Sequence, residues 1–212
     1  MMEDEDLKII LLGESGVGKT NLINITMGQE FNEEEASTGG SSFSQKKLKL
    51  GEKEYNVKLW DTIGQEKFRH LTKLFYSNSK IVIFVYDISV KSTFDALKEY
   101  WVKDINDKLG QNIIIGVVGN KIDKCLEEQV TQEEGEEYAT SIGARFIVTS
   151  AKTEGPKKFE ELLTQLLGDY LKKIGKHDPN ELEEENSNTS KTFELKKHKK
   201  KSNEEKKKKK CC

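Results

Sequence analysis

The chain contains very little cysteine and proline. Only 3 Cys and 2 Pro occur among its 212 residues. Two of the cysteines, Cys211 and Cys212, are the last two residues, and Cys125 stands alone in the body. Neither a disulfide framework nor a paired-cysteine metal site can be built from one body cysteine. Such usage is typical of a reducing, intracellular compartment.

A recognisable secretory signal or membrane span is also lacking. The chain begins with the acidic stretch MMEDEDLK. The apolar stretch LKIILLG, which overlaps its end, is too short for the core of a secretory signal or for a membrane span. We therefore expect the protein to remain inside the cell.

The net charge of −2 hides a strong segregation of charge. Residues 191–212 contain eleven Lys and three Glu, and residues 177–190 contain one Asp and four Glu with no Lys or Arg. The basic character therefore belongs to the tail, and the body is mildly acidic. An acidic body argues against a nucleic-acid-binding domain, so no nucleic acid is expected as a partner.

Short apolar runs alternate with helical patterns, which favours an α/β fold. Strands are expected at residues 8–12, 57–61, 81–87, 113–120 and 145–150, with a more polar edge strand at 42–51 in a hairpin with the second. Helices are expected at 19–27, 68–77, 93–109, 131–142 and 157–174. The pattern predicts a mostly parallel six-stranded sheet flanked by helices on both faces.

The apolar pattern ends near Gly175. Residues 176–212 are rich in acidic residues, Asn and Ser, then in Lys, and they have little to bury. We expect a folded domain over residues 1–175 and a disordered tail over 176–212.

The stretch GESGVGKT, Gly13 to Thr20, lies between an expected strand and an expected helix. It fits G-x-x-x-x-G-K-[ST] in the context that this phosphate-binding motif requires. The glycines let backbone N–H groups point at phosphate oxygens. Lys19 places a charge on the outer phosphates, and Thr20 offers a hydroxyl to Mg²⁺. A nucleoside triphosphate site is therefore predicted here.

The stretch GNKID, residues 119–123, ends a buried strand. It places Asn120 and Asp123 at the carboxyl edge of the sheet, where ligands bind in open α/β folds. A carboxylate there can accept two N–H donors from one guanine edge, and adenine lacks that donor pair. Asp123 therefore favours guanine. TSAKT, residues 149–153, closes the last expected strand.

The stretch WDTIGQE, residues 60–66, follows another expected strand. Asp61 can hold a Mg²⁺-bound water, and Gly64 can bring its N–H close to a terminal phosphate. Gln65 can orient an attacking water, which makes it the candidate catalytic residue.

In this order and spacing, the four motifs resemble the Ras-like small GTPases over nearly all of residues 7–173. KLWDTIGQEKFRHL, LFYSNSKIVIFVYDIS and the terminal double cysteine are similar to Rab-type patterns. SSFSQKKLKL and EGEEYATSIGARF look nearest to the endosomal branch. The resemblance implies a P-loop GTPase fold and a GTP/GDP switch that regulates vesicle trafficking.

The resemblance also implies roles for single residues. The residues that would contact the phosphates are Gly13, Glu14, Ser15, Gly16, Val17, Gly18, Lys19 and Thr20, with Gly64. Mg²⁺ would be held by Thr20 and Thr38, and by Asp61 through water. Guanine would be held by Asn120, Lys121 and Asp123, and the rest of its pocket would be formed by Ser150, Ala151 and Lys152. Phe31 would pack against the base, and the alternative for it is a core phenylalanine at a loop edge.

Two departures from the family pattern concern the expected switches. After Thr38 the family has bulky apolar residues, IGVDF, where this chain has GGSSF. Gly39 makes this switch more mobile, and partners that grip an isoleucine there should bind poorly. Ile63 stands where the family has alanine, and the resemblance implies that its branched side chain lies beside the γ-phosphate region, where we expect it to crowd the second switch. A GTP-binding switch with impaired hydrolysis is therefore the alternative to a working GTPase. A P-loop kinase is a third reading, which GNKID and WDTIGQE disfavour.

Five lysines, Lys206 to Lys210, precede the terminal Cys211 and Cys212. This end is not C-a-a-X and resembles the double-prenylation end of Rab proteins. Two lipid chains are needed because one binds membranes only marginally. The resemblance implies a place on the cytoplasmic face of an endosomal or other vesicle membrane, in exchange with the cytosol.

The partners that the resemblance implies are effectors, an exchange factor, a GTPase activator and a prenyl-binding chaperone. It also implies slow intrinsic hydrolysis and a monomer.

Replacing Cys211 and Cys212 by Ser should release the protein from membranes to the cytosol at any salt concentration. Each buried CH₂ contributes about 0.8 kcal/mol, so two long chains exceed what lysines offer at about 1 kcal/mol each. Membrane fractionation of cells that express each variant measures the effect. Replacing Lys206 to Lys210 by Gln is the matched control and should only weaken or redistribute binding. Equal membrane recovery of the double-serine variant and the wild type would rule out the lipid anchor.

Overall fold

The computed structural model describes residues 7–33, 42–62, 75–110 and 113–175. Six strands form one sheet in the order β2-β3-β1-β4-β5-β6. Their bounds are β1 (Leu7–Leu12), β2 (Ser42–Leu50), β3 (Lys53–Asp61), β4 (Ile81–Asp87), β5 (Ile114–Asn120) and β6 (Arg145–Val148). Among these strands β2 pairs antiparallel with β3, and the other pairings are parallel. The predicted sheet is confirmed, including its polar edge strand.

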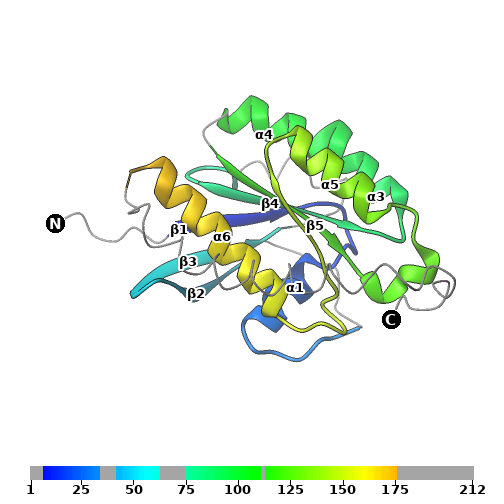
Figure 1. The fold of residues 1–212 in the computed structure, drawn as a ribbon, viewed down its shortest axis with the longest axis horizontal. Helices are drawn as coiled ribbons and strands as arrows, with labels where there is room; N and C mark the ends of the chain where they lie inside the picture. Colours follow the sequence, from blue (N-terminus) through cyan, green and yellow to red (C-terminus); the bar gives the residue numbers. More distant parts are fainter. Residues whose placement is uncertain (1–6, 34–41, 63–74, 111–112, 176–212) are drawn as a thin grey trace, which may run out of the picture.

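Helices cover both faces of the sheet (Figure 1). They are α1 (Lys19–Thr26), α3 (Lys91–Ala96), α4 (Val102–Leu109), α5 (Gln132–Ser141) and α6 (Lys157–Lys173), with a π-helical turn η3 (Leu97–Trp101) and a 3₁₀ segment η4 (Ile122–Glu127). Helices α1 and α6 lie on one face, and α3, α4 and α5 lie on the other. Within the described ranges, no helix has the length and apolar character needed to cross a bilayer.

Each central strand contributes to two hydrophobic clusters, because successive side chains point to opposite faces. In β1, Ile9 and Leu11 pack with α1 and α6, whereas Ile10 and Leu12 pack with the layer of α3, η3 and α4. All seven residues of β4 are buried. This explains why the central strands read as continuous apolar runs, and why β4 was predicted at its observed bounds.

Helix α5 begins as its sequence predicts. The hydroxyl of Thr131 accepts a hydrogen bond from the Glu134 backbone N–H at 3.1 Å. The Glu134 carboxylate does not return to Thr131 but pairs with Lys91, 2.8 Å away. Of the two reciprocal hydrogen bonds of a capping box, the cap therefore has the one that the Thr131 hydroxyl accepts. The Glu134 carboxylate instead connects α5 to α3.

The observed helix differs from the one predicted at residues 93–109 at its start and in one internal turn. It is continuous from Lys91 to Leu109, but η3 interrupts its α-helical hydrogen bonding at Leu97–Trp101. Most of the helix predicted at 68–77 lies outside the described residues.

Strands β2 and β3 form a nine-rung antiparallel ladder that runs from Ser42 paired with Asp61 to Leu50 paired with Lys53. Lys46 fastens the middle of this ladder to both helices behind it. Its ammonium donates to the Thr26 carbonyl at the end of α1 and pairs with Glu160 of α6, each at 2.7 Å. The ribbon is thereby held on the α1 and α6 side.

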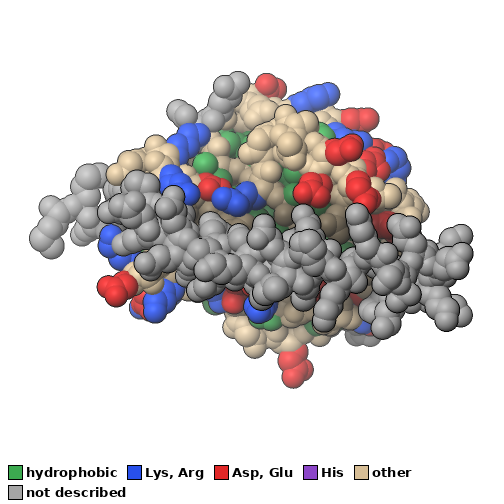
Figure 2. All heavy atoms as spheres, viewed as in Figure 1, with side chains coloured by type: hydrophobic (Ala, Val, Ile, Leu, Met, Phe, Trp, Pro, Cys, Tyr) green, Lys and Arg blue, Asp and Glu red, His purple; other side chains and the backbone are tan. Residues whose placement is uncertain are grey.

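On the face drawn in Figure 2, Lys and Arg side chains lie among Asp and Glu side chains over the described surface. The charges of the body are therefore mixed on this face and not gathered by sign.

Two glycines make room for the buried Tyr86 and the partly buried Phe146 beneath α5. An added Cβ at Gly135 would lie 2.4 Å from the Tyr86 hydroxyl oxygen and 2.7 Å from the Phe146 ring. An added Cβ at Gly119 would lie 2.8 Å from the same hydroxyl. Tyr86 is fully buried, so it has little freedom to give way.

Gly135→Ala should therefore lower the free energy of unfolding by about 1–3 kcal/mol through overpacking. Gly168 of α6 is the matched control, because the atom nearest to its added Cβ is Leu50 Cδ2 at 3.9 Å. Gly168→Ala should raise the free energy of unfolding by about 0.5–1 kcal/mol, since alanine favours the helix. Urea unfolding followed by circular dichroism measures both. Equal stability of the two variants would contradict the packing argument.

Candidate functional site

The predicted motif residues gather at the carboxyl edge of the parallel strands. The loop Gly13–Thr20 follows β1, Asp61 ends β3, Asn120 ends β5, and Ser150 follows β6. In open α/β sheets this edge is where ligands bind. The topology thus brings together segments that are more than a hundred residues apart.

The loop after β1 requires glycine at two positions. Gly13 has φ +148°, and an added Cβ would lie 2.1 Å from the Val85 carbonyl oxygen of β4. Gly18 has φ +95°, and an added Cβ would lie 2.4 Å from Asn120 Nδ2. The first glycine lets the loop pass close to β4, and the second lets it approach Asn120 at the end of β5.

Lys19 is buried beneath the loop, with 5% of its surface exposed. Its ammonium donates to the carbonyls of Gly13 and Glu14, each at 2.9 Å. Burial lowers the pKa of Lys19 to about 8, while the negative charges of Asp61 and Glu14 favour its charged form. These two carbonyls do not neutralise the charge of the Lys19 ammonium. An anionic ligand could therefore bind to it at the N-terminus of α1.

Thr20 and Asp61 bring a hydroxyl and a carboxylate together beside Lys19. The Thr20 hydroxyl donates to Asp61 Oδ2 at 2.7 Å. Both are hard oxygen ligands of the kind that Mg²⁺ takes, so these residues fit the predicted ion. Within the described ranges no group of three or more His, Cys, Asp or Glu side chains could hold a metal. A Mg²⁺ site completed by phosphate oxygens and water does not require such a group.

Asn120 joins the loop after β1 to the loop after β6. Its side-chain amide donates to the Val17 carbonyl at 2.8 Å, and its Oδ1 accepts from the Ala151 backbone N–H at 3.3 Å. Asn120 is 1% exposed, so both bonds lie away from water. The sequence predicted Asn120 as a ligand of the base, and the structure places its side chain between two backbone segments.

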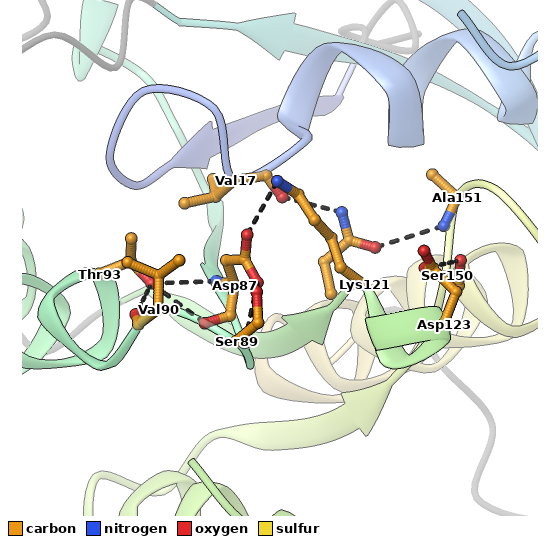
Figure 3. Close-up of polar contacts among 10 residues, drawn as sticks. Val17, Asp87, Ser89, Val90, Thr93, Lys121, Asp123, Ser150 and Ala151 are labelled. Carbon is orange, nitrogen blue, oxygen red and sulfur yellow. Dashed lines mark hydrogen bonds and ion pairs between the residues drawn. The ribbon is translucent and has the colours of Figure 1, made fainter. Parts of the chain in front are cut away.

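Asp123 is held in place by Ser150. The Ser150 hydroxyl donates to Asp123 Oδ1, and the Ser150 oxygen accepts from the backbone N–H groups of Lys152 and Thr153, each at 3.1 Å. Figure 3 shows Asp123 and Ser150 facing one another beside Ala151. The carboxylate expected to hold guanine is therefore oriented by the loop after β6.

Lys121 extends along the same edge and pairs with Asp87 at the end of β4 (Figure 3). The two charged groups are 2.8 Å apart, and the Asp87 side chain is 5% exposed. Burial alone would raise the pKa of Asp87, but hydrogen bonds from Lys121 and from the Ser89 side chain and backbone hold it below its usual value. Sequence reasoning missed Asp87, although an aspartate that ends a wholly apolar strand is a detectable signal.

The segment after α1 is tied to the rest of the domain at three points. Phe31 is half-buried and packs against the cluster of α1 and α6. Asn21 donates to the Asn32 carbonyl at 3.1 Å. Glu33 pairs with Lys152 across 3.1 Å. Part of the Phe31 ring thus serves the core, and its contact with a base stays a prediction.

Several predicted residues lie outside the described ranges. They are Thr38, Gly39, Ser41, Ile63, Gly64, Gln65, Cys211 and Cys212. The remaining phosphate-loop residues, Ser15 and Gly16, lie at the exposed tip of the loop.

Comparisons with known proteins agree with this geometry. The family model described as "Ras family" matches residues 8–171. Ras-related protein Rab-21 of Homo sapiens is 43% identical over 159 residues, covering 75% of this chain and 69% of that protein. Ras-related protein RABC1 of Arabidopsis thaliana is 39% identical over 163 residues, 76% of each chain. Ras-related protein Rab-12 of Homo sapiens is 37% identical over 172 residues, covering 81% and 69%.

Asp123→Asn should weaken GTP binding by about 10- to 100-fold, because it removes a charged acceptor from the guanine edge. The same change should favour a xanthine base, which carries a carbonyl where guanine has an amino group. The substituted amide can still accept from Ser150, so the loop geometry should persist. Competition binding with GTP and xanthosine triphosphate measures the change. Asp107→Asn, on the exposed side of α4, is the control for loss of charge. Unchanged GTP affinity after Asp123→Asn would remove Asp123 from the site.

Proposed function

The chain belongs to the Ras family, among its Rab-type small GTPases, and on that premise we propose that it is a membrane-tethered GTP/GDP switch in vesicle trafficking. As a member of this family it is a GTPase, which converts GTP to GDP and phosphate. The proposal concerns which residues do this work, how fast they do it, and where.

One observation carries the proposal: the buried Asn120 side chain bonds to Val17 and to Ala151. It holds the phosphate motif, the GNKID motif and the TSAK motif at one edge of the sheet. A nucleotide with its phosphates on the first and its base on the other two would lie across all three. That arrangement supports binding of one guanine nucleotide by the residues named from the sequence.

The phosphate end would be served by the loop Gly13–Thr20. Its backbone N–H groups, with the N-terminus of α1, provide donors for phosphate oxygens. Lys19, whose ammonium now bonds to two carbonyls, would place its charge on the outer phosphates. The base end would be served by Asp123, Lys121 and the TSAK loop.

Mg²⁺ would be held by Thr20 and Thr38, with Asp61 acting through water. When bound, the ion would neutralise charge on the β- and γ-phosphates. The Thr20 to Asp61 hydrogen bond supports this assignment, because it already aligns the two oxygen ligands.

Hydrolysis would depend on Gln65, which would orient the attacking water. We expect slow intrinsic turnover and acceleration by a partner that supplies an arginine or a similar charge. The segment that contains Thr38 and the segment that contains Gln65 would be the ones that GTP orders and hydrolysis releases. Effectors, an exchange factor and a prenyl-binding chaperone complete the expected partners of a monomer.

The tail would fix the location of the switch. Residues 176–212 would act as the tether beyond the folded domain 1–175, with lipids on Cys211 and Cys212. The cytoplasmic face of an endosomal or other vesicle membrane is the expected place, in exchange with the cytosol.

The second candidate is a GTP-binding switch whose hydrolysis Ile63 impairs. It rests on the branched side chain where the family has alanine, and on the GGSSF stretch after Thr38. Both candidates bind GTP, so the rate of hydrolysis separates them.

Gln65→Leu should lower the hydrolysis rate by roughly 100-fold, because a leucine side chain cannot hydrogen-bond the attacking water. GTP binding should persist. Single-turnover release of phosphate from preloaded GTP measures the rate, and excess ATP should fail to displace the bound GTP.

Ile63→Ala is the companion variant. It should speed hydrolysis, because it removes the branched side chain that impairs hydrolysis in the second candidate. Equal rates with glutamine and leucine at position 65 would remove the catalytic role. An unchanged rate in Ile63→Ala would count against the second candidate.

A further inference from the structure

A buried tryptophan on the long helix contacts the phosphate-binding loop. The Trp101 indole N–H donates to Glu14 Oε1 at 2.9 Å, and 87 residues separate the two in sequence. Trp101 is fully buried. A buried indole N–H needs an acceptor, and a carboxylate gives a stronger bond than a neutral group.

The geometry of β1 directs Glu14 toward this helix. Ile10 and Leu12 face the cluster of η3 and α4, and Glu14 follows at the same two-residue interval. Gly13 meanwhile lies so close to β4 that an added Cβ would fall 2.1 Å from the Val85 carbonyl oxygen. The start of the loop is thus fixed on one side by β4 and on the other by Trp101.

Glu14 also connects to the lysine of the loop. Its carbonyl and that of Gly13 hold the Lys19 ammonium at 2.9 Å each. The Glu14 side chain therefore bonds to the helix, while its backbone bonds to Lys19. A shift of Glu14 would move the acceptors that set the position of Lys19.

Trp101 ends η3, the turn in which the helix departs from α-helical hydrogen bonding. Such π-helical turns occur frequently at functional sites, because the extra residue changes the direction of the side chains around it. Here the turn includes the residue that meets the phosphate-binding loop.

We infer that Trp101 is a positioning residue for the phosphate-binding loop: its indole N–H holds the Glu14 carboxylate, and through Glu14 it fixes the two carbonyls that hold Lys19. The inference rests on the proposed nucleotide binding at this loop. It assigns to the helix Lys91–Leu109 a direct part in retaining the nucleotide.

The test measures release of GDP with a fluorescent group on its ribose from the full chain, after addition of excess unlabelled GDP. Trp101→Phe keeps an aromatic ring and removes the donor, and Glu14→Ala removes the acceptor. Each should speed release by about ten-fold, as expected for loss of a hydrogen bond to a charged group. The double variant should be no faster than the faster single variant, because both changes remove the same bond.

Two further variants separate positioning from general stability. Glu14→Gln keeps an oxygen acceptor and should stay within about three-fold of the wild type, since a neutral bond is weaker but present. Tyr76→Phe removes a buried hydrogen bond, 2.9 Å long, that the Tyr76 hydroxyl donates to Asp104. Asp104 lies three residues after Trp101 on the same helix. Tyr76→Phe should destabilise the fold to urea yet change release by no more than about two-fold, because it leaves the Glu14 contact intact.

Unchanged release in Trp101→Phe would overturn the inference, as would effects that multiply in the double variant. Acceleration by Tyr76→Phe equal to that of Trp101→Phe would also overturn it. If Trp101→Phe does not fold, Glu14→Ala decides alone, and a wild-type release rate would sink the inference. A wild-type chain that fails to retain labelled GDP would instead remove the proposed function.

Discussion

The site depends on one buried amide, that of Asn120. Parallel strands bring five strand ends to one edge of the sheet, but they do not by themselves hold the loops there in a fixed arrangement. Asn120 donates to the loop after β1 and accepts from the loop after β6, with 1% of its surface exposed. Because both bonds are shielded from water, loss of the amide would leave a buried carbonyl and a buried N–H without a partner. Glycine is required at position 18 beside this amide, because a Cβ there would collide with the Asn120 amide nitrogen.

Around that amide, the charged groups of the site are held mainly by each other and by the backbone. Lys121 pairs with Asp87, Thr20 with Asp61, and Lys19 with two carbonyls. Each of these groups has a polar partner before any ligand arrives, as burial of polar groups demands. A nucleotide would therefore exchange some of these partners for its own oxygen atoms. Affinity would reflect the difference between the two sets of contacts.

Sequence reasoning recovered what local patterns encode. Strand β4 was predicted at its observed bounds because all seven residues are buried apolar or strand-ending positions, and α5 was located by the Thr131 cap. The loops of GESGVGKT, GNKID and TSAKT were placed correctly at the sheet edge, because parallel topology leaves few alternatives. The π-helical turn was not predicted, since its spacing satisfies the same apolar stripe as an α-helix. The contacts of Asp87 with Lys121 and of Glu14 with Trp101 depend on which strands and helices become neighbours, and no short window of sequence contains both partners. The roles of Thr38 and Gln65 stay predictions, because both lie outside the described residues.

The register of the edge ribbon has a consequence for how the chain could report its nucleotide. Ser42 and Asp61 are partners on the last rung of the β2 and β3 ladder. The segment that enters β2 and the segment that leaves β3 therefore join the sheet one strand spacing apart, about 5 Å. Thr20 bonds to Asp61 at this same corner. A ligand placed at this corner would lie next to the ends of both strands, while Lys46 ties the middle of the ribbon to α1 and α6. Because Ser42 and Asp61 are paired, the described ends of β2 and β3 are expected to respond to such a ligand together.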